Sequence, residues 1–161
     1  MTEISPPVPK TEALDFPLHA VGFEYDLLSP EKLTGHLTVT ETSCQPFKVL
    51  HGGVTALIAE GMASMGAYIA SGFHRIAGVQ LSTNHIRAAR LGELVQIEAT
   101  PIQKGKTIQV WEVQLWKADP STSGAKKIAL VSTSRVTLLS NLPSSKEMKG
   151  FEDIVKQYAK L

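Results

Sequence analysis

Residues 51–73 read HGGVTALIAEGMASMGAYIASGF, and Glu60 is the only charged residue between Gly52 and Phe73. A run that is apolar nearly all round predicts a helix enclosed by other elements rather than laid on a surface. At about 100° per residue, the large side chains gather on one side of this helix. They are Val54, Ile58, Met62, Met65 and Ile69. A lone carboxylate in such a helix must be paired, protonated, in contact with water, or chemically active.

The opposite side of the predicted helix carries small residues around Glu60. Ser64 follows Glu60 by one turn, so the two side chains can meet. Small residues allow another backbone or a ligand to come close. We therefore expect this side to line a slot, formed by Gly53, Ala56, Glu60, Ala63, Ser64 and Ala67.

Strand-like segments flank the helix on both sides. They are rich in β-branched and apolar residues and are separated by turn residues. Two precede the helix, at 22–29 and 33–41, and four follow it, at 76–89, 94–104, 106–117 and 126–139. One enclosed helix among successive strands predicts an α+β fold, in which a curved antiparallel sheet wraps around one long central helix.

The ends of the chain differ in composition from this middle part. Residues 1–16 are proline-rich and are expected to form a mobile N-terminal tail, and residues 17–142 form the domain. Residues 143–161 are expected to form a C-terminal tail with a short amphipathic helix and a targeting tripeptide. The apolar side of that helix carries Phe151, Ile154, Val155 and Tyr158.

Composition excludes several classes of function. The net charge is +1 and charged residues make up 19 % of the chain, so no basic footprint for nucleic acid or a membrane surface is present. The helix at 52–73 is a poor membrane span because Gly and Ala dominate it and Glu60 lies near its middle. The single cysteine, Cys44, suits a reducing compartment. The five histidines are scattered, and no glycine-rich phosphate loop occurs, so we expect no metal and no cofactor.

The helix start offers chemistry of its own. Gly52 and Gly53 leave backbone N–H groups open at the positive end of the helix, where they can polarise a carbonyl group. Glu60 lies about 12 Å further along by helical rise, and a substrate bent over the helix end would bring it into reach as a base or nucleophile for acyl transfer. The alternative is that His51-Gly52-Gly53 is only a turn and Glu60 a paired core acid. No Gly-x-Ser-x-Gly motif marks a serine nucleophile, and nothing marks a base for Cys44, which we expect to be a small core or loop residue.

The stretch QPFKVLHGGVTALIAEGMAS, residues 45–64, resembles the hotdog-fold acyl-CoA thioesterases that carry their catalytic glutamate on the central helix. The family spacing of Gln, His-Gly, Glu and Ser or Thr is met by Gln45, His51-Gly52, Glu60 and Ser64. Residues 78–117 also resemble the family, so the similarity covers about 17–141. Within the family, the chain looks most similar to the plant peroxisomal branch that hydrolyses 1,4-dihydroxy-2-naphthoyl-CoA in phylloquinone synthesis.

The resemblance implies a role for each residue of this motif. The Gly52 N–H would polarise the thioester carbonyl, while Gln45 and His51 orient the thioester or shape the turn. Glu60 would attack the carbonyl carbon or activate water, and the sequence leaves both routes open. Ser64 would help to place the water or the carboxylate.

The resemblance also implies a binding surface for acyl-CoA. His85 would line the acyl pocket, with a plain sheet histidine as the alternative, and Gly53 would add to the helix start. Basic residues on loops would meet the phosphates of coenzyme A, unless they are solvated strand ends. The candidates are Lys104, Lys106 and Arg135, with Arg87 less favoured. The family forms homodimers, often paired into homotetramers, with active sites shared between subunits.

Two further expectations concern location and alternatives. The ending Ala159-Lys160-Leu161 is a conservative variant of the Ser-Lys-Leu peroxisomal address. Alternative functions are a thioesterase for other aryl- or medium-chain acyl-CoAs, and a non-catalytic hotdog module that binds acyl-CoA or a protein partner. A hotdog hydratase is disfavoured because it needs an Asp/His pair, and no aspartate occurs between Asp26 and Asp119.

Overall fold

A computed structural model describes residues 4–161 of the chain. Two short helices open the chain, a long helix follows two strands, and four strands precede the C-terminal helix. In order, the elements are α1 (Thr11–Leu14), α2 (Phe16–Ala20), β1 (Phe23–Leu27), β2 (Leu33–Thr38), α3 (Gly52–Ala70), β3 (Arg75–His85), β4 (Leu94–Lys104), β5 (Ile108–Asp119), β6 (Lys126–Leu142), the 3-10 helix η1 (Lys146–Met148) and α4 (Lys149–Tyr158).

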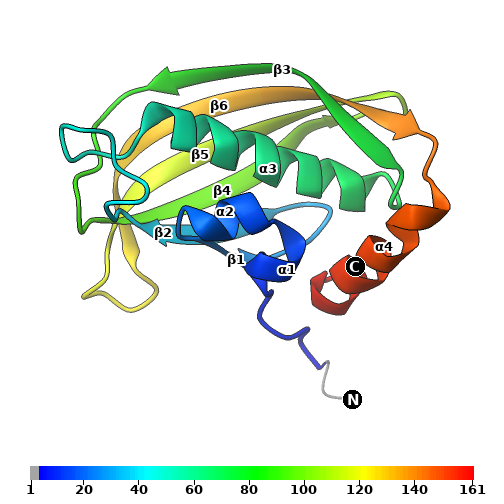
Figure 1. The fold of residues 1–161 in the computed structure, drawn as a ribbon, viewed down its shortest axis with the longest axis horizontal. Coiled ribbons are helices and arrows are strands. Elements are labelled where there is room, and N and C mark those ends of the chain that lie inside the picture. Colours follow the sequence, from blue (N-terminus) through cyan, green and yellow to red (C-terminus); the bar gives the residue numbers. More distant parts are fainter. Residues whose placement is uncertain (1–3) are drawn as a thin grey trace.

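The strands form one antiparallel sheet in the order β1-β2-β4-β5-β6-β3. The sheet curves around α3, and α1, α2 and α4 lie on the opposite side of that helix (Figure 1). The predicted α+β arrangement is therefore confirmed. Every predicted strand is present, and β4 has the expected bounds. The helix ends earlier than expected, because Gly72 and Phe73 both have positive φ, +74° and +68°, which a helix cannot continue through.

The large side of α3 packs into the sheet as expected. Ile58, Met62, Met65 and Ile69 are buried in the main core cluster, and Val54 is partly buried against it. Ten of the 19 residues of α3 are buried. Composition and length alone would let α3 cross a membrane, with a mean hydropathy of 1.2, but 56 % of that window is buried inside the domain. Enclosure by the sheet accounts for its apolar sequence.

Gly66 marks the closest approach of α3 to the sheet. A Cβ atom at Gly66 would stand 2.6 Å from two ring carbons of Trp111, whose side chain is fully buried. The indole Nε1–H of Trp111 donates to the Gln109 side chain over 2.8 Å, and the Gln109 amide donates to the Ala67 carbonyl over 3.2 Å. Packing and hydrogen bonds therefore fix the helix on β5 at the same place.

The expectation of a mobile tail over residues 1–16 is wrong for its last part. Thr11 and Leu14 lie in α1 and are buried, and the Thr11 hydroxyl accepts a hydrogen bond of 2.7 Å from the Tyr25 N–H. The proline-rich composition describes only the chain before α1. Residues 1–3 of the expected tail lie outside the described residues.

The predicted C-terminal helix is confirmed as α4. Val155 is fully buried, and the other apolar residues of α4 pack against the core from the side of α3 that the sheet leaves open. After α4, Ala159 forms a bridge with Leu28, and the Lys160 N–H donates to the Leu28 carbonyl over 2.8 Å. The end of the chain is thus attached to the end of β1.

Replacing Gly66 with alanine should destabilise the fold. The added methyl group meets the buried Trp111 ring, and overpacking of this kind costs about 1–3 kcal/mol, more than the roughly 1 kcal/mol that alanine gains in helix propensity. Gly150→Ala in α4 is the matched control, because a Cβ there meets nothing within 4 Å. Urea unfolding at one fixed protein concentration should show a lower midpoint for Gly66→Ala only. Equal midpoints for the two variants would contradict the proposed contact.

Candidate active site

The start of α3 is held by its N-cap residue, His51. The ring Nδ1 of His51 accepts a hydrogen bond of 2.8 Å from the Gly53 N–H, and the His51 carbonyl accepts one of 3.1 Å from Thr55. The His51 N–H itself donates to the Ser43 carbonyl over 2.8 Å. The histidine of the motif therefore shapes the helix start.

Gly52 is the first residue of α3, and its N–H has no acceptor within the described part of the chain. An open N–H at this end of a helix is a donor aimed outward, reinforced by the helix dipole. His85 of β3 lies directly beside it, since a Cβ at Gly52 would stand 3.2 Å from the His85 Cε1 and 3.3 Å from its Nε2. The fold thus brings His85 to the helix start.

Gln45 lies on a tight loop that leads into the helix. Its N–H donates to the Val49 carbonyl over 2.9 Å, and its carbonyl accepts from Lys48 over 3.0 Å. Its side-chain oxygen accepts from the Phe47 N–H. The side-chain NH₂ has no acceptor among residues 4–161, so it remains available as a donor.

Glu60 is exposed to solvent, and no ion pair or hydrogen bond to it occurs within the described residues. Its carboxylate lies against the backbone of Gly78 in β3, where a Cβ would stand 2.9 Å from the Glu60 Oε1. A side chain at position 78 would therefore displace the carboxylate. Within the described residues, Glu60 is therefore not a paired core acid. The remaining explanations for this lone carboxylate are contact with water and a chemical role.

The slot around Glu60 is narrower than the sequence pattern predicted. Ala63 and Ala67 are fully buried, because the curved sheet reaches around α3 further than a flat one would. The expectation that Ala63 and Ala67 line the slot is therefore wrong. Gly53, Ala56 and Ser64 remain at least partly accessible on the Glu60 side.

Gly52 and Glu60 are separated along one helix by about 12 Å of helical rise. Helical side chains lean toward the N-terminus, which shortens the gap without closing it. One carbonyl group therefore cannot touch the Gly52 N–H and the Glu60 carboxylate of the same subunit.

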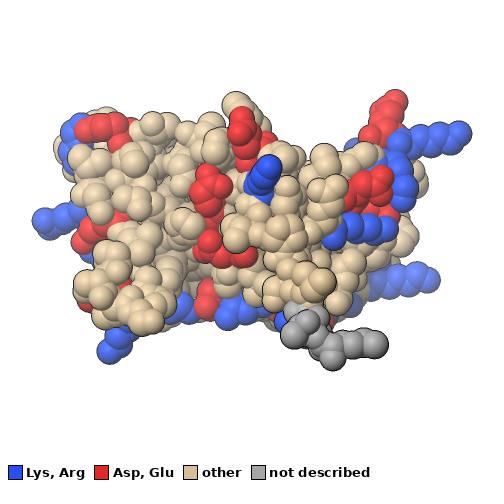
Figure 2. Space-filling model, turned by 90° about the horizontal axis from the view of Figure 1, so that it is seen from below, with Lys and Arg blue, Asp and Glu red and all other residues tan. Residues whose placement is uncertain are grey.

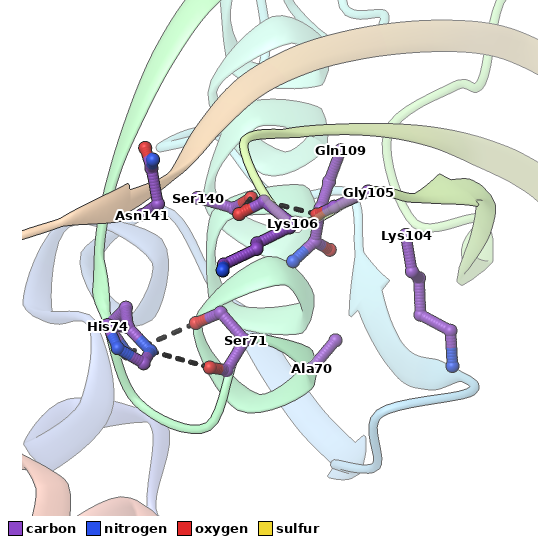
Figure 3. A pocket seen from close by; sticks show the side chains of 9 residues that line it. All are labelled: Ala70, Ser71, His74, Lys104, Gly105, Lys106, Gln109, Ser140 and Asn141. Carbon is purple, nitrogen blue, oxygen red and sulfur yellow. Dashed lines mark hydrogen bonds between the residues drawn. The ribbon is translucent and has the colours of Figure 1, made fainter.

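The two lysines of the β4–β5 turn are close together. Lys104, Gly105 and Lys106 line a cavity of about 340 Å³ at the far end of α3, together with Ser71 and His74. Lys106 extends over this cavity, and Lys104 lies at its opposite side (Figure 3). The cavity therefore presents cationic and polar groups to whatever enters it.

The two candidate arginines lie elsewhere. Arg135 is exposed between buried Ser134 and Val136, so it points to the outer face of the sheet, away from α3. Arg87 follows β3, and its guanidinium donates to the Leu130 carbonyl over 3.3 Å. The sequence could not separate these arginines from the lysines, because the facing of a strand residue depends on the register of the sheet.

Sequence reasoning missed part of the surroundings of Ser64. A second cavity, of about 300 Å³, lies beside Gly61 and Ser64, and it is walled in part by Asp15 and Phe151. Asp15 caps α2 and is followed by Phe16-Pro17, a pattern typical of a helix start. This N-cap pattern would have predicted that the ordered part of the chain begins before residue 17. It would also have indicated that residues of the expected tail line a cavity.

Comparison with known proteins agrees with this fold. Residues 47–123 match the family described as the thioesterase superfamily. The chain is 56 % identical to 1,4-dihydroxy-2-naphthoyl-CoA thioesterase 2 of Arabidopsis thaliana over 144 residues, which are 89 % of this chain and 91 % of that protein. It is 38 % identical to a 1,4-dihydroxy-2-naphthoyl-CoA hydrolase of Listeria monocytogenes over 96 residues, 59 % of this chain and 77 % of the relative.

Solved structures of thioesterases have a fold similar to that of this chain. A thioesterase from Haemophilus influenzae is 31 % identical, with a TM-score of 0.65 over 81 % of this chain and 86 % of that one. The chain belongs to the thioesterase superfamily and is a thioester hydrolase with the hotdog fold. The implied resemblance and fold are therefore confirmed. Within the superfamily, its similarity to the Arabidopsis protein runs through nearly the whole of both chains.

Replacing Glu60 with glutamine should abolish most of the thioesterase activity without unfolding the protein. The change keeps size and hydrogen-bonding capacity but removes basicity, and loss of a general base typically lowers the rate by about 10²–10⁴. Because Glu60 is exposed and unpaired in the subunit, thermal stability should stay near the wild-type value. Release of free thiol from an aryl-CoA ester measures the rate.

Glu112→Gln is the matched control for Glu60→Gln. Glu112 lies opposite Arg135 on the outer face of the sheet and accepts a hydrogen bond from Thr133 that glutamine can also accept. This variant should keep wild-type activity. Near-wild-type turnover in Glu60→Gln would show instead that Glu60 has no part in the chemistry.

Proposed function

We propose that this thioesterase hydrolyses 1,4-dihydroxy-2-naphthoyl-CoA to 1,4-dihydroxy-2-naphthoate and coenzyme A, a reaction of phylloquinone (vitamin K1) synthesis. The Arabidopsis relative carries the substrate assignment, because it is named for this thioester and is similar over nearly its whole length. Relatives named as hydrolases of the same thioester in Escherichia coli and Listeria monocytogenes support it.

The site residues divide the reaction between two groups. The thioester carbonyl oxygen accepts a hydrogen bond from the Gly52 N–H, which stabilises the negative charge that develops there. Glu60 takes a proton from water as the water oxygen attacks the carbonyl carbon. The C–S bond then breaks, and the proton passes to the coenzyme A thiolate. In the alternative route Glu60 attacks the carbon itself, the C–S bond breaks to release the coenzyme A thiolate, and an anhydride forms. Water then opens the anhydride, which frees the acid and Glu60, and the proton lost from water passes to the thiolate.

A second copy of the chain completes the site in this proposal. β3 lies at the edge of the sheet and pairs only with β6, and its exposed residues include Val79. A long uncovered edge strand is a surface for pairing with another strand. Antiparallel pairing of two β3 strands about a two-fold axis would continue the sheet and set the two α3 helices side by side in opposite directions.

The position of the axis follows from the motif. In an antiparallel helix pair, Gly52 of one subunit lies beside Glu60 of the other when the axis passes near Ala56, midway between them. Ala56 and Gly53 are small, which allows the close approach of the partner helix. Each active site then takes its N–H donor from one subunit and its carboxylate from the other. The homodimer is the unit of function, and a homotetramer would join two such dimers.

Coenzyme A would extend from this site toward the β4–β5 turn. The cavity lined by Lys104 and Lys106 begins at the end of α3, about 15 Å from Glu60 by helical rise. Lys106 forms no ion pair within residues 4–161, whereas Lys104 pairs with Glu31. The phosphate groups of coenzyme A would bind the ammonium groups of Lys104 and Lys106. They would displace the exposed Glu31 carboxylate from Lys104.

Peroxisomal targeting is the proposed role of Ala159-Lys160-Leu161. Leu161 is 71 % exposed, whereas Ala159 is buried and bridges Leu28. A receptor that binds these residues in extended form would first have to detach Lys160 from Leu28. A fluorescent protein fused to the N-terminus should co-localise with a peroxisome marker, and an unchanged pattern after deletion of the tripeptide would contradict this role.

The substrate assignment predicts a ranking of thioesters. kcat/KM should be highest for 1,4-dihydroxy-2-naphthoyl-CoA, lower for benzoyl-CoA and lowest for decanoyl-CoA, because only the first fills a planar site that has polar partners for its hydroxyls. Thiol release under identical conditions measures all three. A preference for decanoyl-CoA would contradict the assignment and identify a medium-chain enzyme, and no turnover of any of them would favour a binding module.

Subunit mixing should test the shared site. Gly52→Pro removes the N–H at a position where proline is tolerated in helices, and Gly52→Ala keeps it as the matched control. Neither Gly52→Pro nor Glu60→Gln should be active alone. Co-expression of the two should restore about one quarter of the wild-type sites, because half of randomly formed dimers hold one complete site of two. A different affinity tag on each variant allows the mixed dimers to be isolated. If these mixed dimers show no activity, the N–H group and the carboxylate of one active site belong to the same subunit.

A further inference from the structure

The cavity of about 300 Å³ beside Ser64 lies on the side of α3 that faces away from most of the sheet. Gly61 and Ser64 line it, and Ser64 lies one turn after Glu60 on the same side of α3, so the cavity lies on the side of the helix that carries Glu60. Its volume is at the small end of the range for ligand pockets. It therefore suits a ring system rather than a whole acyl-CoA molecule.

The outer walls of this cavity come from the two ends of the chain. Leu14 and Asp15 line it from the junction of α1 and α2, and Met148 and Phe151 line it from η1 and α4. Figure 1 shows these elements beneath α3, opposite the sheet. None of them lies within residues 47–123, the part that matches the thioesterase family. The catalytic motif and these walls therefore belong to different parts of the sequence.

Aromatic rings form one wall. The rings of Tyr68 and Phe151 are stacked, with centroids 5.6 Å apart and an interplanar angle of 27°. Phe73 meets Tyr68 edge-on at 5.2 Å, which supports the stack from behind. Tyr68 is only 5 % exposed, so the wall is held in place. A preformed aromatic wall of this kind suits a planar aromatic ligand.

Among the described residues, Asp15 is the only acidic side chain that lines the cavity. Its Oδ1 accepts a hydrogen bond of 3.1 Å from the Leu18 N–H, while its Oδ2 stands 3.3 Å from the point that a Cβ of Gly61 would occupy. No cation pairs with it within the described residues. Burial raises the pKa of this carboxyl above its usual range, and the Leu18 hydrogen bond opposes that rise.

A half-buried carboxyl group beside apolar walls is stabilised by a hydrogen-bond partner. The surrounding charges make an anionic partner unfavourable, because acidic side chains gather along the middle of the face that carries α1, α2 and α4, while most of the basic ones lie toward its margins (Figure 2). A neutral hydroxyl group on an aromatic ring supplies a hydrogen-bond partner for Asp15 without adding a negative charge. It can donate to the carboxylate, or accept from the protonated acid.

We propose that this cavity holds the ring system of the acyl group, with Tyr68 and Phe151 packed against its face and Asp15 hydrogen-bonded to a ring hydroxyl. The inference rests on the proposed function, since it places the dihydroxynaphthoyl group next to Glu60. It assigns substrate selection to the N-terminal helices and α4, and the chemistry to α3. Asp15 and Phe151 are then specificity residues that act on the substrate from outside the catalytic motif.

Asp15→Ser tests the hydrogen bond. Serine also caps helices well, so α2 keeps its N-cap while the shorter side chain no longer reaches the cavity. The expected result is a fall of about 10- to 100-fold in kcat/KM for 1,4-dihydroxy-2-naphthoyl-CoA, the range for losing a hydrogen bond to a charged group. For 2-naphthoyl-CoA, which has no ring hydroxyl, kcat/KM should change by less than about twofold, since no such bond is lost.

The two thioesters separate the possible failures. If wild-type enzyme does not turn over 1,4-dihydroxy-2-naphthoyl-CoA, the proposed function is wrong, and this inference fails with it. If wild-type enzyme turns it over and Asp15→Ser leaves the ratio between the two thioesters unchanged, the proposed function stands and the role of Asp15 is wrong. An equal loss with both thioesters likewise overturns the role, because it indicates only a structural effect.

Phe151→Ala tests the aromatic wall independently. Removing the ring should raise KM several-fold more for both naphthoyl thioesters than for benzoyl-CoA, because the larger ring system covers more of the aromatic wall. Phe151→Tyr should restore the wild-type values, because the ring face is the same. Equal changes with benzoyl- and naphthoyl-CoA would overturn the assignment of α4 to the acyl site.

Discussion

The contact of Gly66 with the indole of Trp111 fixes how deeply α3 lies in the curved sheet. With the helix at this depth, Gln109 reaches the Ala67 carbonyl, and β3 passes close enough for Gly78 to meet the Glu60 carboxylate. The same placement sets His85 beside Gly52. Gly52 and Glu60, the two groups to which we assign the reaction, therefore depend on the placement of one helix, and that placement is set near the C-terminal end of the helix, at Gly66.

The fold, and the arrangement of the candidate site residues along the chain, could be predicted because their signals are local. The apolar run with a single charge specifies an enclosed helix, and short turns between β-branched segments specify an antiparallel sheet. Gln45, His51, Gly52, Glu60 and Ser64 follow one another along a loop and a helix. Their spacing in sequence therefore carries most of their arrangement in space.

The surroundings of the motif could not be predicted in the same way, because they depend on distant contacts. Thr11 is ordered by a hydrogen bond from Tyr25, and Phe151 meets Tyr68 only once α4 folds back beneath α3. Arg135 and Lys106 are both basic residues beside or within predicted strands, so the sequence does not distinguish them. The register of the sheet places Arg135 on its outer face, and the β4–β5 turn places Lys106 at the cavity beside the end of α3. Spacing along a helix also leaves about 12 Å of helical rise between Gly52 and Glu60, and we propose that a second subunit closes this gap.

The cap at the start of α3 makes the shape of the helix start depend on a single imidazole ring. Because the His51 Nδ1 accepts a hydrogen bond from the Gly53 N–H, that ring satisfies one of the open backbone donors of the first turn. The Gly52 N–H, one residue earlier, is left as a donor without an acceptor among the described residues. The histidine of the motif therefore selects which backbone donor of the helix stays free for another molecule.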